Sequence, residues 1–108
     1  MSLEQKAIEL AQMLKETEEF KALTSAQTRV KLDPIAEDLV RQLQQSQQEL
    51  YIMQMEGREP TMEQIQQIQL LETKVKSNLT LTNFVKAQEA FGQKMNEVNE
   101  TITKELFS

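Results

Sequence analysis

Two clusters of glutamates are the residues of this 108-residue sequence that could most readily do chemistry. In chain order they are Glu16, Glu18 and Glu19, followed by Glu56, Glu59 and Glu63. Clustered carboxylates can bind a divalent cation through oxygen, and a facing pair can act as general acid and base in hydrolysis. A calcium loop, however, needs ligands at alternate positions around a glycine, which the loop of the second cluster lacks. We therefore interpret the first cluster as favourable charge at a helix start and the second as a solvated loop, and we expect no metal site.

The sequence lacks the side chains on which most enzyme mechanisms depend. It contains no cysteine and no histidine, so thiol nucleophiles, imidazole bases, disulfides and the common zinc and iron–sulfur ligand sets are excluded. No pattern places two carboxylates opposite each other in a pocket. The sequence thus predicts a protein that is not an enzyme, with no catalytic residues and no cofactor.

The charge distribution limits the classes of partner. The net charge is −5, and the 12 basic residues are scattered rather than gathered on one face. Nucleic acids and anionic membranes both attract clusters of lysine and arginine, so neither is expected as a direct partner. No apolar stretch approaches the ~20 residues that span a membrane, and the first residues lack the apolar run of a signal peptide. These features favour a cytoplasmic protein.

The elements that must position these side chains are helices. Hydrophobic residues make up 39% of the chain, glycine and proline occur only twice each, and β-branched and aromatic residues never alternate over the length of a strand. We predict an all-α fold with a single domain over 1–108, a helical bundle of four to five helices built on a long antiparallel hairpin. The expected segments are short N-terminal helices within 3–31, a long helix at 34–56, and helices at 62–77 and 80–106. Thr17 favours two helices over one kinked helix in the first segment.

The predicted long helix has the clearest signals at its ends. Asp33 suits the N-cap and Pro34 the first helical position, because the missing N–H of proline is unbonded there. Gly57 suits the left-handed residue that follows a helix. Between these ends a four-three spacing predicts a heptad seam, made of Leu32, Ala36, Leu39, Leu43, Ser46, Leu50 and Met53.

Apolar residues surround the C-terminal end of this helix and point in nearly all directions. A helix that is apolar all round is normally buried all round, and one antiparallel neighbour cannot cover it, so we expect a homodimer or a higher homo-oligomer. The predicted interface consists of Gln47, Leu50, Tyr51, Ile52, Met53, Met55, Phe84 and Phe91. For Tyr51 and the methionines, packing inside the protein's own core is the alternative and simpler interpretation.

The order of several short motifs resembles one bacterial family. Glu19-Phe20 opens a helix after a short break, and Leu43 and Gln47 lie in the long helix. An acidic loop and a glutamine-rich helix follow the motif Gln54-Met55-Glu56-Gly57. A terminal helix that finishes in Leu106 opens with Phe84-Val85-Lys86-Ala87-Gln88-Glu89-Ala90. In this order the motifs resemble the YlbF/YmcA family of small bacterial helical proteins, most closely its YheA-like branch, over nearly the whole chain.

The resemblance implies a cytosolic, oligomeric helical bundle with a regulatory role. Members of the family form a complex with the YaaT protein that promotes competence, sporulation and biofilm formation and is tied to mRNA cleavage by RNase Y. Iron–sulfur clusters are associated with that complex, but this chain has no cysteine to ligate one. The resemblance supplies no catalytic residues, and the regulatory role it implies is an analogy of fold.

Three functions are consistent with these observations. The leading hypothesis is a non-catalytic, homo-oligomeric interaction and regulatory protein that binds a partner of the YaaT/RNase Y type near the hairpin tip. The alternative is a chaperone-like hairpin that holds client proteins through the same apolar tip. A metal-dependent hydrolase built on the glutamate clusters is the third and least favoured hypothesis.

Overall fold

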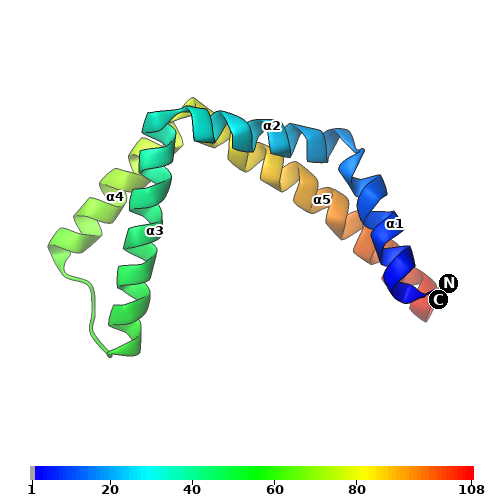
Figure 1. Cartoon of the computed structure of the whole chain (residues 1–108). Coiled ribbons are helices and arrows are strands. Elements are labelled where there is room, and N and C mark those ends of the chain that lie inside the picture. The colour runs from blue at the N-terminus through cyan, green and yellow to red at the C-terminus, as the bar shows by residue number, and fades with distance from the viewer. Residues whose placement is uncertain (1) are drawn as a thin grey trace. The chain divides into compact units, whose positions relative to one another are not determined.

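A computed structural model describes residues 2–108 of the chain, and within this range they form five α-helices and no β-strand. The helices, shown in Figure 1, are α1 (Leu3–Lys15), α2 (Glu18–Leu32), α3 (Pro34–Met55), α4 (Met62–Ser77) and α5 (Leu79–Phe107). The predicted all-α class, with four to five helices, is therefore confirmed.

The N-terminal segment consists of two helices because the chain breaks at Glu16 and Thr17. The Thr17 hydroxyl donates a hydrogen bond to the carbonyl of Leu14 (2.6 Å) and accepts one from the backbone N–H of Phe20 (3.2 Å). Thr17 thus satisfies an acceptor at the end of α1 and a donor at the start of α2. The structure agrees with the preference for two helices over one kinked helix.

The start of α3 is fixed by the two carboxylate oxygens of Asp33. One oxygen accepts hydrogen bonds from the backbone N–H groups of Ile35 (3.1 Å) and Ala36 (3.2 Å), and Pro34 follows in the first turn. The other oxygen accepts a hydrogen bond from the hydroxyl of Thr80 at 2.8 Å. Asp33 therefore caps α3 and also ties its first turn to the start of α5.

The end of α3 is closed by a glycine in the left-handed conformation. Gly57 has a φ of 71°, and the N–H of Arg58 donates to the carbonyl of Met53 at 2.8 Å. This backbone closure satisfies carbonyls that the helix end would otherwise leave unpaired. The helix ends at Met55 and not at residue 56, because Glu56 already is the capping residue.

α5 begins one residue before the predicted position, at Leu79. Asn78 ends α4 with an extended backbone (ψ 115°), and its side-chain oxygen accepts a hydrogen bond from the Leu81 N–H at 3.0 Å. Asn78 therefore caps α5, which also extends one residue beyond the predicted end, to Phe107. Differences of one residue are ordinary at helix ends.

The chain divides into two compact units, one of which, Arg29–Thr82, holds the antiparallel hairpin of α3 and α4. Figure 1 shows these two helices side by side. The core of this unit consists of Ala36, Leu39 and Leu71 of the hairpin and Leu81 of α5, with Val30, Val40, Leu43 and Val75 packed around it. Because this core is small, the hairpin buries only part of its apolar surface.

The predicted heptad seam is correct in α3 but does not extend before it. Ala36, Leu39 and Met53 are buried, and the seam positions between them are half-buried. Leu32, in contrast, is the last residue of α2 and is 78% exposed. The extended backbone of Asp33 separates Leu32 from the helix whose spacing it appears to continue.

The second unit contains the described residues up to Thr28 together with Asn83–Ser108, which include α1, most of α2 and most of α5. An edge-to-face contact of Phe20 and Phe91, with ring centroids 5.4 Å apart, joins α2 to α5. Packing in this unit is shallow, because none of the residues Leu3–Lys15 of α1 is buried. The assignment of residues 1–108 to a single domain stays a prediction.

Candidate protein-interaction surface

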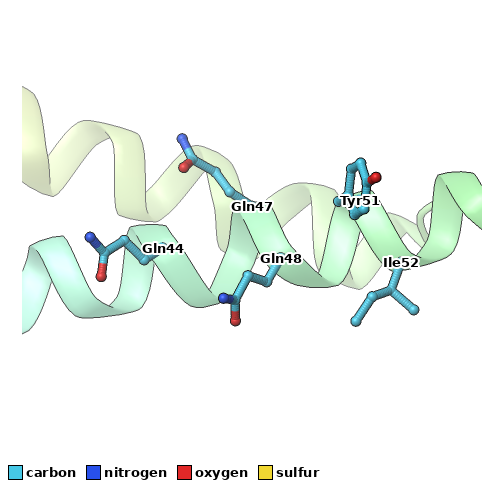
Figure 2. Close-up of a pocket in the computed structure, with 5 residues that line it drawn as sticks. All are labelled: Gln44, Gln47, Gln48, Tyr51 and Ile52. Carbon is cyan, nitrogen blue, oxygen red and sulfur yellow. The ribbon is translucent and has the colours of Figure 1, made fainter.

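The outward side of the C-terminal half of α3 carries a shallow hollow (Figure 2). It is lined by Gln44, Gln47, Gln48, Tyr51 and Ile52. Tyr51 is 64% exposed, Ile52 is 51% exposed, and Met55 in the next turn is 73% exposed. Together these six uncharged residues form the α3 outer surface.

Helical spacing explains why four of these side chains form one stripe, which Gln47 and Ile52 flank. Gln44, Gln48, Tyr51 and Met55 follow a four-three-four spacing, which aligns residues along one stripe of an α-helix. Figure 2 shows α4 behind α3, with Gln47 and Tyr51 extending to one side of α3 and Gln48 and Ile52 to the other. The amides can donate and accept hydrogen bonds around an apolar patch, so the surface is suited to protein contact.

The structure places two of the predicted interface residues toward the inside of the hairpin. Met53 is only 8% exposed and Leu50 is half-buried. Both line a small cavity between α3 and α4, beside Gln64 and Ile68. Of the apolar residues around the end of α3, Met53 thus contributes to the hairpin core, whereas Tyr51, Ile52 and Met55 stay exposed.

Phe84 and Phe91 belong to the other unit of the chain, so they are described separately from the α3 outer surface. Both are half-buried. The ring of Phe91 packs edge-on against Phe20, with an angle of 60° between the ring planes. Phe91 therefore holds α5 against α2 in addition to its predicted role at an interface.

One glutamate of each cluster forms an ion pair with a basic residue. A carboxylate oxygen of Glu19 lies 3.6 Å from the Lys94 ammonium, which is also 3.4 Å from Glu97. The charge of Glu19, followed by that of Glu97, raises the pKa of Lys94. Glu56 pairs with Arg58. Within residues 2–108 no three acidic side chains are arranged to hold a metal ion.

Sequence reasoning did not identify Gln44 and Gln48 as part of the exposed surface. A signal was present, because Glu49 is the only charged residue between positions 42 and 55. A charge-free stretch of exposed helix is unusual, since the solvent side of a helix normally carries charged residues.

In the part of the chain that the structure describes, no helix is long and apolar enough to cross a membrane.

Comparison with known proteins links the chain to one bacterial family. Residues 3–106 match the family described as control of competence regulator ComK, YlbF/YmcA. A UPF0342 protein of Halalkalibacterium halodurans is 34% identical over 101 residues, covering 94% of this chain and 87% of the relative. A UPF0342 protein of Lacticaseibacillus casei is 30% identical over 100 residues, covering 93% and 88%. One from Staphylococcus saprophyticus is 28% identical with the same coverage. The YheA-like branch stays a prediction.

Proposed function

The chain belongs to the YlbF/YmcA family, and from this premise we propose that it is a self-associating regulatory protein that binds a protein partner and catalyses no reaction. The family is described by its control of a regulator and not by a reaction. A protein of this kind acts through its contact surfaces. The exposure of Tyr51, Ile52 and Met55 on the α3 outer surface is the observation that carries the proposal.

The cost of exposed apolar side chains supports binding through this surface. Full burial of a large apolar side chain contributes roughly 1.5–3 kcal/mol, and the three apolar residues of the α3 outer surface are each more than half exposed. Exposed apolar patches with a polar rim are typical of protein-binding sites. Tyrosine is enriched among the residues that dominate binding energy, which makes Tyr51 the natural anchor.

Self-association is supported by the small amount of core that one chain forms. The buried apolar residues among those described are Ala26, Ala36, Leu39, Met53, Leu71 and Leu81. A helical chain of this length normally buries a full stripe of each helix. Contact with a second copy would bury stripes that a single chain leaves exposed.

The partner expected from the family is a protein of the YaaT or RNase Y type, and binding can be measured directly. The purified chain would be titrated against a YaaT-like protein and against RNase Y, and the affinity of each pair measured by surface plasmon resonance. Ile52→Glu places a charge in the α3 outer surface and should weaken binding at least tenfold. Gln45→Glu adds the same charge outside that surface and should leave affinity within about twofold.

Two results would contradict this proposal. One is equal affinity of the Ile52→Glu variant and the unaltered chain; the other is the absence of binding to either partner protein. A chaperone-like function, the alternative, predicts a different pattern. The chain would then suppress aggregation of several unrelated proteins at comparable concentrations, and Ile52→Glu would reduce that suppression for all of them.

A further inference from the structure

The two sides of the α3/α4 hairpin differ in polarity. One side forms a groove lined by Gln42, Gln45, Ser46, Glu49, Gln67, Leu70, Leu71 and Lys74. Polar and charged side chains dominate this groove, with Glu49 on α3 and Lys74 on α4. This polar side is suited to solvent, because burial of Glu49 or Lys74 without a partner would be unfavourable.

The opposite side of the hairpin is mainly apolar. Leu43 and Leu50 follow Gln42 and Glu49 by one residue, and in α4 each of Gln67 and Lys74 is likewise followed by an apolar residue. One residue turns an α-helix by about 100°, which rotates these side chains from the groove toward the other side of the hairpin. Leu50 and Ile68 also line the small cavity between the two helices. This apolar side consists of Val40, Leu43, Gln47 and Leu50 on α3 and Ile65, Ile68 and Val75 on α4.

The residues of the apolar side are incompletely covered by the hairpin itself. Leu43, Leu50, Ile68 and Val75 are half-buried, and Ile65 is 40% exposed. They lie on both helices, so a flat partner can contact all of them at once. Two more helices laid across this side would convert the hairpin into a four-helix bundle, which buries one stripe of every helix.

Charge favours a second copy of this chain as the occupant. The net charge of −5 makes two copies repel each other unless their contact surfaces carry no net charge. The apolar side has no charged residue on α3. On α4, Glu72 shares the stripe of Ile65 and Ile68, and Lys76 four residues later carries the opposite charge. Gln47 both donates and accepts hydrogen bonds, so it can pair with its own counterpart.

The size of the apolar side also matches a dimer interface. α4 has 16 residues and is therefore about 24 Å long. Two adjacent helices are about 20 Å wide, which gives a footprint of roughly 500 Å² per copy. Two such footprints total about 1,000 Å², near the lower limit for a specific interface, and the relief of the side chains adds to this area.

We propose that a second copy docks through its own apolar side, with Gln47 near the two-fold axis. Residues close to the axis of a two-fold interface contact their own counterparts, and Gln47 lies near the middle of the apolar side, between Leu43 and Leu50. This inference rests on the self-association proposed above and assigns it a surface. Gln47 and Tyr51 extend to the same side of α3 (Figure 2), so a second copy docked here also covers that part of the α3 outer surface. Ile52 extends to the other side and remains open to a different protein.

Cysteine cross-linking tests this assignment, because the chain has no cysteine of its own. Gln47→Cys should give a covalent dimer with a short bismaleimide reagent in high yield. Gln45→Cys, which is two residues away on the polar side, should give at least fivefold less at the same concentration. Both positions are exposed in the single chain, so neither variant disturbs the hairpin core.

Sedimentation of the unaltered chain separates the possible failures. If it is monomeric at about 100 µM, both the self-association and this inference are wrong. If it is dimeric but Gln45→Cys cross-links as well as or better than Gln47→Cys, only the assignment to the apolar side is wrong. Leu50→Glu provides a second measurement. This variant should remain helical by circular dichroism and sediment as a monomer, and a persistent dimer would also overturn the assignment.

Discussion

Truncation of Leu71 to alanine should destabilise the hairpin far more than the same change at its neighbour Leu70. The two leucines differ in burial, since Leu71 is 6% exposed and Leu70 is 57% exposed. Leucine to alanine removes three carbon groups, each worth about 0.8 kcal/mol when buried, or ~2.4 kcal/mol in all. Nearly all of this is lost at Leu71 and less than half at Leu70.

The cavity left behind adds to the cost at Leu71. Buried leucine-to-alanine changes cost about 2–5 kcal/mol, and this thin hairpin can partly collapse, so we expect about 2.5–3.5 kcal/mol for Leu71→Ala. We expect at most about 1 kcal/mol for Leu70→Ala. The larger value corresponds to a fall in Tm of roughly 10–20 °C for a chain of this size.

Urea unfolding followed by circular dichroism measures both changes. The variants must be compared at one chain concentration, because self-association makes apparent stability depend on concentration. Equal losses for the two variants would refute the assignment of Leu71 to the core and Leu70 to the polar side. So would a loss below about 1 kcal/mol for Leu71→Ala.

Three further substitutions test the backbone conformation at the two glycines and the hydrogen bond of Asp33. Gly57→Ala should cost about 1–2 kcal/mol in urea unfolding, because Gly57 has a φ of 71° although the space around it is open. Gly92→Ala should stabilise by up to about 1 kcal/mol, since Gly92 lies inside α5 with nothing within 4 Å of an added Cβ; a loss would show an unseen close contact. The hydrogen bond from the Thr80 hydroxyl is the main cause that lowers the pKa of Asp33. The ionised carboxylate therefore stabilises the fold at pH values above its unfolded pKa of about 3.9. This stabilisation is lost as the pH falls through the lowered pKa of the folded state. Thr80→Val should raise that pKa and shrink the loss of stability between pH 6 and pH 2.5; an unchanged loss would contradict this origin.

Local signals in the sequence were sufficient to locate the helices and their ends. Asp33, Pro34 and Gly57 act through neighbouring backbone groups, so a cap can be identified without knowledge of the rest of the fold. Thr17 is another local case, since both of its hydrogen-bond partners lie three residues away. Only the exact helix ends differ, each by one residue, as at Glu56 and Asn78, which act as caps.

Features that depend on packing could not be obtained from spacing alone. The heptad pattern includes Leu32, because spacing does not reveal that the backbone is extended at Asp33. Apolar residues point in all directions at the end of α3, and only the position of α4 decides that Met53 is inside and Tyr51 outside. The hydrogen bond between Asp33 and Thr80 joins residues 47 positions apart, a separation at which no local pattern applies.

This hydrogen bond also has a consequence for how the chain tolerates change in length. Asp33 and Thr80 close a loop that contains the whole hairpin, so the chain leaves and returns at one place. The entropic free-energy cost of closing such a loop rises only by about 0.6 kcal/mol for each doubling of its length. A tag or a small domain inserted between Gly57 and Thr61 would therefore leave the closure almost unaffected. We expect the same geometry to let the hairpin grow or shrink by matched helical turns without a change in the residues outside it.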